Sequence, residues 1–280
     1  MDALTGERPT LYVPSRDGTP IAVFRSGAPA GRPLVLVHGT SADHRTWRVA
    51  APRLAPRFEL WAMDRRGRGE SGDTTDPANW AIERELEDLA AVAEAAAAEA
   101  GEPADVLGHS LGGRIALGAS LLTHAIGRVV AYEGAPVLRD ADDASADLAA
   151  RLRAHLDAGD LDGLLATFMT EAVGMPAEDL AAFRANPVWP LRAAAGRTIV
   201  RELEAARSAS AIDIDALARV QVPVLQLVGS ASPPWFRDGA AALNARLAQG
   251  SLEVIDGARH AAHHSHAPEL VALVSAFLLG

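Results

Sequence analysis

Hydrophobic residues in this chain gather into short continuous runs, and longer segments of mixed polarity separate these runs. Continuous apolar runs without alternation are typical of strands that other elements cover on both faces. We therefore expect buried strands near residues 33–37, 58–63, 104–107, 128–132, 222–228 and 251–255. Upstream, the segment from Thr10 to Phe24 predicts two short strands that turn at Arg16-Asp17-Gly18, where glycine accommodates a positive φ.

The segments between the predicted strands are mostly helical in character. The clearest is a long helix rich in alanine and glutamate, from about Pro77 to Ala100. Strands that alternate with helices predict a parallel sheet with right-handed crossovers. We therefore expect an α/β fold with a mostly parallel, eight-stranded sheet and flanking helices.

One segment departs from this alternation. From Leu138 to Ile212 the sequence has helical periodicity and no convincing strand. In a parallel α/β domain, such a block between consecutive strands is an insertion over the carboxyl edge of the sheet, where ligands bind. We therefore expect a core domain of residues 1–137 and 213–280, with a helical cap (lid) at residues 138–212.

Residues 108–112 read Gly-His-Ser-Leu-Gly and follow the predicted strand at residues 104–107. A serine between two glycines at this spacing can occupy a strained turn from strand to helix, because the glycines let neighbouring backbone pass closely. This pattern is typical of a nucleophile elbow, which holds the hydroxyl out at the carboxyl edge of a sheet. Ser110 is therefore the candidate nucleophile.

Composition narrows the chemistry. The chain has no cysteine, which excludes disulfides, thiolate metal sites and a cysteine nucleophile. All of its basic residues are arginine, which excludes a lysine Schiff base and a Ser-Lys dyad. The net charge of −10 and the scattered arginines argue against a nucleic-acid partner. With no membrane-spanning stretch and no signal peptide at its start, we expect a cytoplasmic monomer or homodimer that acts on a small molecule, with no membrane partner.

Four motifs, in order along the chain, resemble those of the α/β-hydrolase fold superfamily. His38-Gly39-Thr40 is similar to the H-G-x after the third strand, and the run from Asp64 to Ser71 to the D-x-x-G-x-G-x-S loop after the fourth. The segment from Gly108 to Gly112 is similar to the family's elbow, and Gly257 to His260 to the segment that carries its late histidine. The resemblance spans nearly the whole chain apart from the predicted cap.

The resemblance and the chemistry of serine together imply roles for individual residues. Serine needs a base within hydrogen-bond reach, and an imidazole has a pKa suited to that task, so His260 is the expected base. By family analogy, the backbone N–H groups of Thr40 and Leu111 form the oxyanion hole. The histidines just beyond His260 are expected to be the polar start of the last helix, with neither a metal nor a cofactor required.

The sequence departs from the family where the triad acid is expected. After the seventh strand, Ser232 occupies the place of the usual aspartate. The segment from Tyr132 to Pro136 resembles the Y-E-x-P run of a bacterial group of α/β hydrolases, in which the acid has moved to the end of the sixth strand. We therefore expect Glu133 to be the triad acid; Asp238, or no acid at all, are the alternatives.

A serine at the elbow attacks acyl carbon, whereas relatives with an aspartate there attack alkyl carbon. We therefore expect a serine hydrolase that cleaves a carboxylic ester, lactone or thioester of a small to medium, partly apolar substrate. C–C bond cleavage on the same site, and a ligand-binding protein without hydrolysis, are the alternatives. The expected substrate contacts are Trp47, Phe168, Trp189, Trp235 and Phe236.

Overall fold

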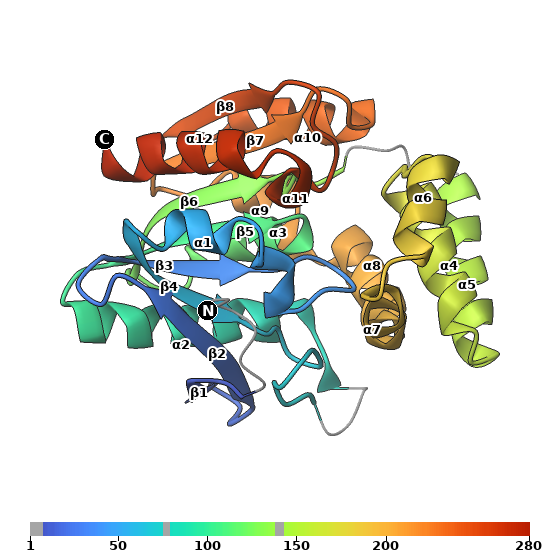
Figure 1. Ribbon diagram of the computed structural model, residues 1–280, viewed down its shortest axis with the longest axis horizontal. Helices are drawn as coiled ribbons and strands as arrows, with labels where there is room; N and C mark the ends of the chain where they lie inside the picture. The colour runs from blue at the N-terminus through green and yellow to red at the C-terminus, as the bar shows by residue number, and fades with distance from the viewer. Residues whose placement is uncertain (1–7, 75–78, 138–142) are drawn as a thin grey trace.

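The apolar runs form the strands of one sheet in the computed structural model, which describes residues 8–74, 79–137 and 143–280 (Figure 1). The eight strands follow the spatial order β1-β2-β4-β3-β5-β6-β7-β8. Strand β2 runs antiparallel to β1 and β4, and all other neighbouring strands are parallel, which confirms the predicted mostly parallel sheet. The strands are β1 (Leu11–Pro14), β2 (Pro20–Gly27), β3 (Arg32–Val37), β4 (Phe58–Met63), β5 (Ala104–His109), β6 (Ile126–Tyr132), β7 (Val224–Gly229) and β8 (Gly250–Ile255).

Both faces of the sheet are covered by helices, which explains why the central strands are mostly apolar and are buried at nearly every position. In β3, Val35 and Val37 face one hydrophobic cluster, while Leu34 and Leu36 face the other. Residues of α2 (Ile82–Ala100), α3 (Leu111–Ala119) and α10 (Pro234–Asn244) complete the first cluster. Residues of α1 (Ala51–Leu54) and α12 (Ala267–Leu279) complete the second.

Helix α2 is the long helix that its alanine and glutamate content predicts. It begins at Ile82 and ends at Ala100, where Gly101 takes a φ of 74° and terminates it. The predicted start at Pro77 lies outside the described residues. Among the described residues, no helix is both long enough and apolar enough to span a membrane.

The segment between β6 and β7 is helical, and its described part contains no strand. Its main helices are α4 (Asp143–Asp157), α5 (Leu161–Thr167), the π-helix η3 (Phe168–Ala172), α6 (Ala177–Arg184), α7 (Trp189–Ala194) and α8 (Ile199–Ser208). They share a hydrophobic cluster of their own, in which Leu152, Leu164 and Ile199 are fully buried. Helices α4 to α7 lie beyond the carboxyl ends of the strands (Figure 1). The predicted boundary at Leu138 lies outside the described residues, so the division into core and cap stays a prediction.

Candidate active site

Ser110 lies at the corner between β5 and α3, as the elbow pattern predicts. Its backbone has φ 54° and ψ −126°, a conformation that is costly for a residue with a side chain. The Ser110 N–H donates to the carbonyl of Tyr132 on the neighbouring strand at 2.8 Å, which helps to hold the corner. A Cβ at Gly112 would lie 2.4 Å from the carbonyl oxygens of Val37 and His38. The second glycine of the motif is therefore needed for close packing against the end of β3.

Glu133 occupies the equivalent corner at the end of β6. Its side chain is fully buried, and Oε2 accepts a hydrogen bond from His260 Nδ1 at 2.5 Å. Its other oxygen, Oε1, accepts from the Gly229 N–H at 2.9 Å. A buried carboxylate requires such partners, and each of its oxygens has one. By contrast, Asp238 is exposed on α10, so the acid in contact with His260 is Glu133.

The neighbouring strand ends hold the backbone that carries His260. The Tyr132 hydroxyl donates to the carbonyl of Arg259 at 2.6 Å. His109 Nε2 lies 2.7 Å from the carbonyl of His260 and therefore carries the proton. Burial, and after it the charge of His260, lowers the pKa of His109 well below its ordinary value, so this histidine stays neutral. The His260 ring stacks on Phe236, with a centroid separation of 4.5 Å.

The loop after β3 is held against the loop after β4 by buried polar contacts. His38 Nδ1 donates to the carbonyl of Gly39 at 2.9 Å, and Nε2 accepts from the Arg65 N–H at 3.0 Å. Burial, followed by the charge of Arg65, lowers the pKa of His38 to about 3, which keeps the ring neutral. Ser41, three residues after His38, has a positive φ of 55°. This packing fixes the position of Thr40 beside Ser110.

Asp64 organises the loop after β4. One carboxylate oxygen accepts from the backbone N–H of His44 at 2.7 Å and from its ring Nδ1 at 2.9 Å. The other oxygen accepts from the Glu70 N–H at 2.9 Å. Asp43, His44 and Asp64 lie close enough together to hold a cation. Because protein donors already satisfy both oxygens of Asp64, we assign this group to loop structure.

A buried charge network joins the same loop to the helical segment. Arg65 pairs with Glu85 of α2 at 2.6 Å, and Arg68 pairs with Glu202 of α8. Burial alone would raise the pKa of Glu202, but the charges of Arg65 and Arg68 outweigh it and hold this pKa at about 2. Partly buried Arg201 makes two hydrogen bonds to Asp73, with both distances 2.9 Å. Helix α8 is therefore tied to the sheet edge by ion pairs.

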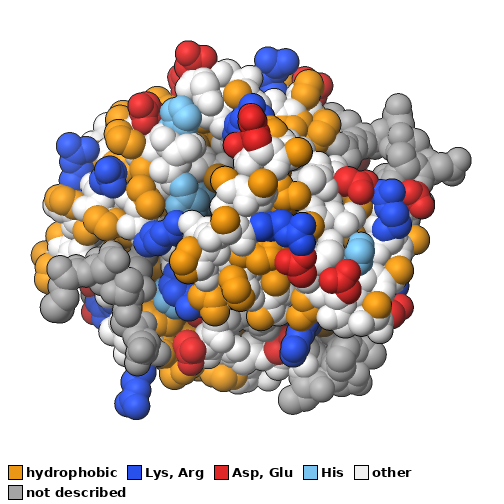
Figure 2. Space-filling model, turned by 45° about the vertical axis from the view of Figure 1, so that its right-hand side comes forward, with side chains coloured by type: hydrophobic (Ala, Val, Ile, Leu, Met, Phe, Trp, Pro, Cys, Tyr) orange, Lys and Arg blue, Asp and Glu red, His pale blue; other side chains and the backbone are white. Residues whose placement is uncertain are grey.

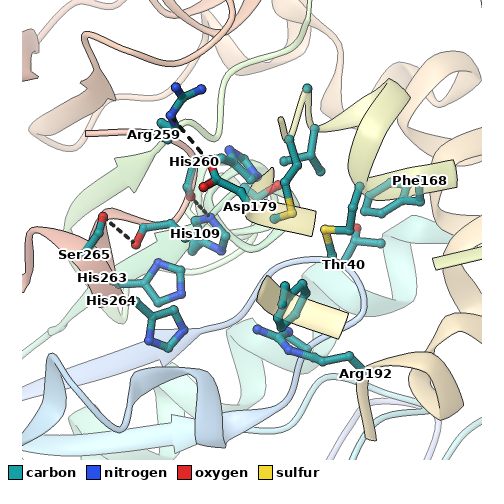
Figure 3. A pocket seen from close by; sticks show the side chains of 18 of the residues that line it. Thr40, His109, Phe168, Asp179, Arg192, Arg259, His260, His263, His264 and Ser265 are labelled. Carbon is teal, nitrogen blue, oxygen red and sulfur yellow. Dashed lines mark hydrogen bonds and ion pairs between the residues drawn. The ribbon is translucent and has the colours of Figure 1, made fainter. Parts of the chain in front are cut away.

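Two cavities meet at Ser110 and His260. The larger has a volume of about 380 Å³, and Figure 3 shows its residues converging from the helical segment and from the sheet edge. Its apolar wall comes largely from the helical segment and includes Phe168, Met169 and Met175, whereas its polar wall includes His109, His263, His264 and Arg192. The smaller cavity, of about 100 Å³, is also lined by Thr40, Leu111 and Glu133. The expected nucleophile, base, acid and oxyanion residues thus surround one connected space.

The predicted substrate contacts divide into two groups. Phe168 lines both cavities, and Phe236 lines the smaller one. Trp47, Trp189 and Trp235 line neither cavity. Trp47 is fully buried and packs against His263 at 5.3 Å, while Trp189 is buried and donates from its indole N–H to Asp162 at 2.6 Å. The ring of Trp235 packs beside Gly174. For these three tryptophans the expectation is corrected, because Trp47 packs in the core cluster with α1 and α12, Trp189 packs in the cluster of the helical segment, and Trp235 packs beside Gly174 and Phe236.

Sequence reasoning missed several polar residues of the larger cavity. His263 is buried beside His109, rather than being part of a solvated helix start, and short helix α11 (Ala262–Ser265) turns it inward. For His109 the sequence did offer a signal: it directly precedes Ser110, so it had to lie at the same edge of the sheet. Arg192 belongs to no recognisable motif, so the sequence offered no signal for it. It reaches the cavity only because of how α7 packs.

Comparisons with known proteins agree with this geometry. A family model described as the alpha/beta hydrolase family matches residues 34–273. The solved structure of an alpha/beta hydrolase from Sphaerobacter thermophilus is 36% identical, with a TM-score of 0.80, and the match covers 94% of this chain and 99% of that one. The pimeloyl-[acyl-carrier protein] methyl ester esterase of Neisseria meningitidis serogroup B is 28% identical over 90% of this chain and 94% of its own length.

A third relative matches only in part. The probable oxidoreductase EphD of Mycobacterium tuberculosis is 37% identical over 100 residues, which are 36% of this chain and 17% of that protein. This chain therefore corresponds to only a small part of that much longer protein. The family match, in contrast, extends from β3 to α12 and includes Ser110, Glu133 and His260. The chain therefore belongs to the alpha/beta hydrolase family.

Proposed function

We propose that this protein is a serine hydrolase that cleaves a carboxylic ester through an acyl-enzyme, with Ser110, His260 and Glu133 as its triad. The observation that carries the proposal is the 2.5 Å hydrogen bond from His260 Nδ1 to buried Glu133, at the sheet edge that presents Ser110. The esterase among the relatives supports the same reaction class. Lactones and thioesters belong to this class because they offer the same acyl carbon.

The first half of the reaction forms the acyl-enzyme. Ser110 Oγ attacks the acyl carbon while His260 Nε2 takes the hydroxyl proton. Glu133 holds the proton on Nδ1, which leaves Nε2 free as the base, and it stabilises the imidazolium that forms. The backbone N–H groups of Thr40 and Leu111 donate to the developing oxyanion. When the tetrahedral intermediate collapses, His260 gives its proton to the leaving alcohol.

The second half releases the acid. Water attacks the acyl-enzyme carbonyl and gives a proton to His260 Nε2. The same backbone donors stabilise the second oxyanion, and collapse returns the proton to Ser110 Oγ as the carboxylic acid departs. The lining around Ser110 includes Phe168, Met169 and Val173, which favours a substrate with an apolar acyl or alcohol part.

A covalent probe tests the proposal. Incubation with a fluorophosphonate, followed by peptide mass spectrometry, is expected to place one adduct on Ser110. A p-nitrophenyl ester should give a burst of one p-nitrophenol per chain if deacylation is slower than acylation. Ser110→Ala should abolish the adduct and lower kcat by at least about 10⁴-fold.

The matched control is Ser208→Ala, which removes an exposed serine of α8 that lines neither cavity. It should keep both the adduct and the turnover. Absence of an adduct on Ser110, together with no turnover of any ester tested, would refute the serine hydrolase. Turnover with normal activity in Ser110→Ala would refute the assigned nucleophile alone.

A further inference from the structure

Arg192 has an unusual environment for a cation. It projects from α7 to the loop after β3, where Nη1 donates to the carbonyl of Ser41 at 2.9 Å and Nη2 donates to Thr46 Oγ1 at 3.1 Å. Both acceptors are uncharged. Among the residues that the structure describes, Arg192 forms no ion pair, although it lines the larger cavity. Since a guanidinium has five N–H donors, these two bonds leave part of its fork available.

The positive charge of Arg192 is therefore poorly compensated. Burial is the main reason that its pKa falls, to about 10, so the side chain remains a cation at neutral pH. Asp43 is the acid whose charge raises the pKa of Arg192, but both oxygens of Asp43 already bind Arg45. Arg192 is partly buried, and a charge withdrawn from water without an opposite charge costs stability, which an anion from outside would offset.

The wall beside Arg192 consists of neutral imidazoles and carries no negative charge. The rings of His109, His263 and His264 lie in a row, with centroid separations of 4.4 and 4.3 Å (Figure 3). Burial is the main cause that lowers the pKa of all three, and the charge of Arg192 contributes in each case, so all three stay neutral. Their Nδ1 atoms have no hydrogen-bond partner among the described residues.

The other charged residues of the lining also leave the cavity with an excess of positive charge. Exposed Arg48 has no ion pair among the described residues, and the one acid in the lining, Asp179, faces Arg259 at 3.9 Å. On the face shown in Figure 2, arginine side chains lie close to histidine side chains among hydrophobic ones. The chain as a whole carries a net charge of −10, so this cavity differs in sign from the protein around it.

We propose that the larger cavity takes an ester that also carries a free carboxylate, and that Arg192 pairs with this carboxylate. The proposal rests on the proposed function, because it names the substrate class of that same site. The apolar residues that line the same cavity suit a methylene chain, and the guanidinium fork matches a carboxylate in a bidentate arrangement. The carboxylate can belong to the acyl part or to the alcohol part of the ester.

Matched pairs of esters test the proposal by hydrolysis. Monomethyl adipate carries the carboxylate on the acyl part, and dimethyl adipate is its uncharged partner. The acetate ester of 6-hydroxyhexanoate carries it on the alcohol part, and hexyl acetate is its partner. We expect kcat/KM to favour the charged member of one pair by at least about tenfold, and that pair identifies the side.

Arg192→Met should abolish this preference by raising KM for the charged ester about 10- to 100-fold, while kcat/KM for the uncharged ester changes less than about threefold. Arg192→Lys keeps a charge without the fork and should recover part of the preference. The control is Arg53→Met, because Arg53 is an exposed arginine outside the cavity that donates only to the carbonyl of Val49. It should leave both kinetic constants unchanged.

A binding measurement separates this proposal from the reaction itself. In Ser110→Ala, calorimetry should detect adipate and should not detect adipamide, and Arg192→Met should weaken adipate binding at least about tenfold. If no ester is hydrolysed but adipate binds through Arg192, the proposed function fails and the carboxylate site stands. If both members of each pair are hydrolysed equally, or if Arg192→Met lowers kcat equally for both, Arg192 only braces the Ser41 loop and the carboxylate site is refuted.

Discussion

The ends of β5 and β6 are two versions of the same corner. His109 and Tyr132 are paired across these neighbouring strands, and each is followed by a residue with positive φ, 54° at Ser110 and 48° at Glu133. The side chain before each corner holds a carbonyl of the His260 segment. Strained backbone of this kind persists only where surrounding structure enforces it. Both strand ends therefore help to build the site.

The two corners differ in what they present. Ser110 opens helix α3 and borders both cavities, where a substrate can reach it. The carboxylate of Glu133 is fully buried and turned towards His260 and Gly229. One backbone conformation thus exposes the proposed nucleophile at one strand end and, one strand away, buries the carboxylate that binds the proposed base.

Among the substitutions that test this comparison of the two corners, Glu133→Gln has the largest expected effect. The amide can still accept from the Gly229 N–H, but it offers His260 Nδ1 a donor, which places the ring proton on Nε2 and removes the base. We expect kcat to fall by about 10³- to 10⁴-fold in ester hydrolysis, with an unchanged fold by circular dichroism. Asp238→Asn is the matched control and should retain normal kcat. Normal turnover by Glu133→Gln would refute the assignment of Glu133 as the acid that orients His260.

Gly134→Ala should disturb the spacing between the corners. A Cβ there would lie 2.8 Å from the backbone of Gly113, which belongs to the start of α3. We expect a loss of about 1–3 kcal/mol in the free energy of unfolding by urea, together with a lower kcat. Gly196→Ala is the control, since its Cβ would meet no atom closer than 3.4 Å. Equal unfolding midpoints for the two variants would contradict the close contact.

A third corner follows β3, where buried His38 is expected to make the stability of the fold depend on pH. His38 has a folded pKa of about 3 against an ordinary value of 6.5, so the unfolded chain binds the extra proton as pH falls below 6.5. Its contribution to stability is present above that pH and is lost towards pH 3, at about 1.4 kcal/mol per pH unit. His38→Gln should flatten the slope of unfolding free energy against pH between 6 and 4 by about that amount. If the unfolding free energies of wild type and variant change in parallel with pH, His38 does not contribute this pH dependence.

The smallest effect is expected from Tyr132→Phe. The substitution leaves the Arg259 carbonyl without its hydroxyl donor and loosens the His260 segment. We expect kcat to fall about 5- to 10-fold with KM nearly constant, which is roughly 1–1.4 kcal/mol. Tyr12→Phe, at a tyrosine that is 50% exposed, is the control and should not alter kcat. A change in KM alone would indicate that Tyr132 acts on substrate binding instead.

Much of the architecture was predictable because it depends on local patterns. The apolar runs gave the positions of the strands to within about two residues, since burial on both faces requires continuous hydrophobicity. The elbow was predictable because its glycines are close in sequence to Ser110. The tryptophans were predicted less well, because an aromatic side chain packs equally well in a core or in a cavity wall. Trp47 and Trp189 are in the core, whereas Phe168 lines the cavities.

By itself, the sequence determined the α/β fold, the elbow at Ser110 and the candidates for base and acid, because hydrophobic period and glycine spacing act over a few residues. Only the tertiary structure decided which carboxylate meets His260, since Glu133 is 127 residues away along the chain. It also decided that Arg192 reaches the cavity without a carboxylate partner. Contacts of this kind depend on how strand ends and helices pack in space. The run from Tyr132 to Pro136 named Glu133 as a candidate without showing its contact, and no local pattern marked Arg192.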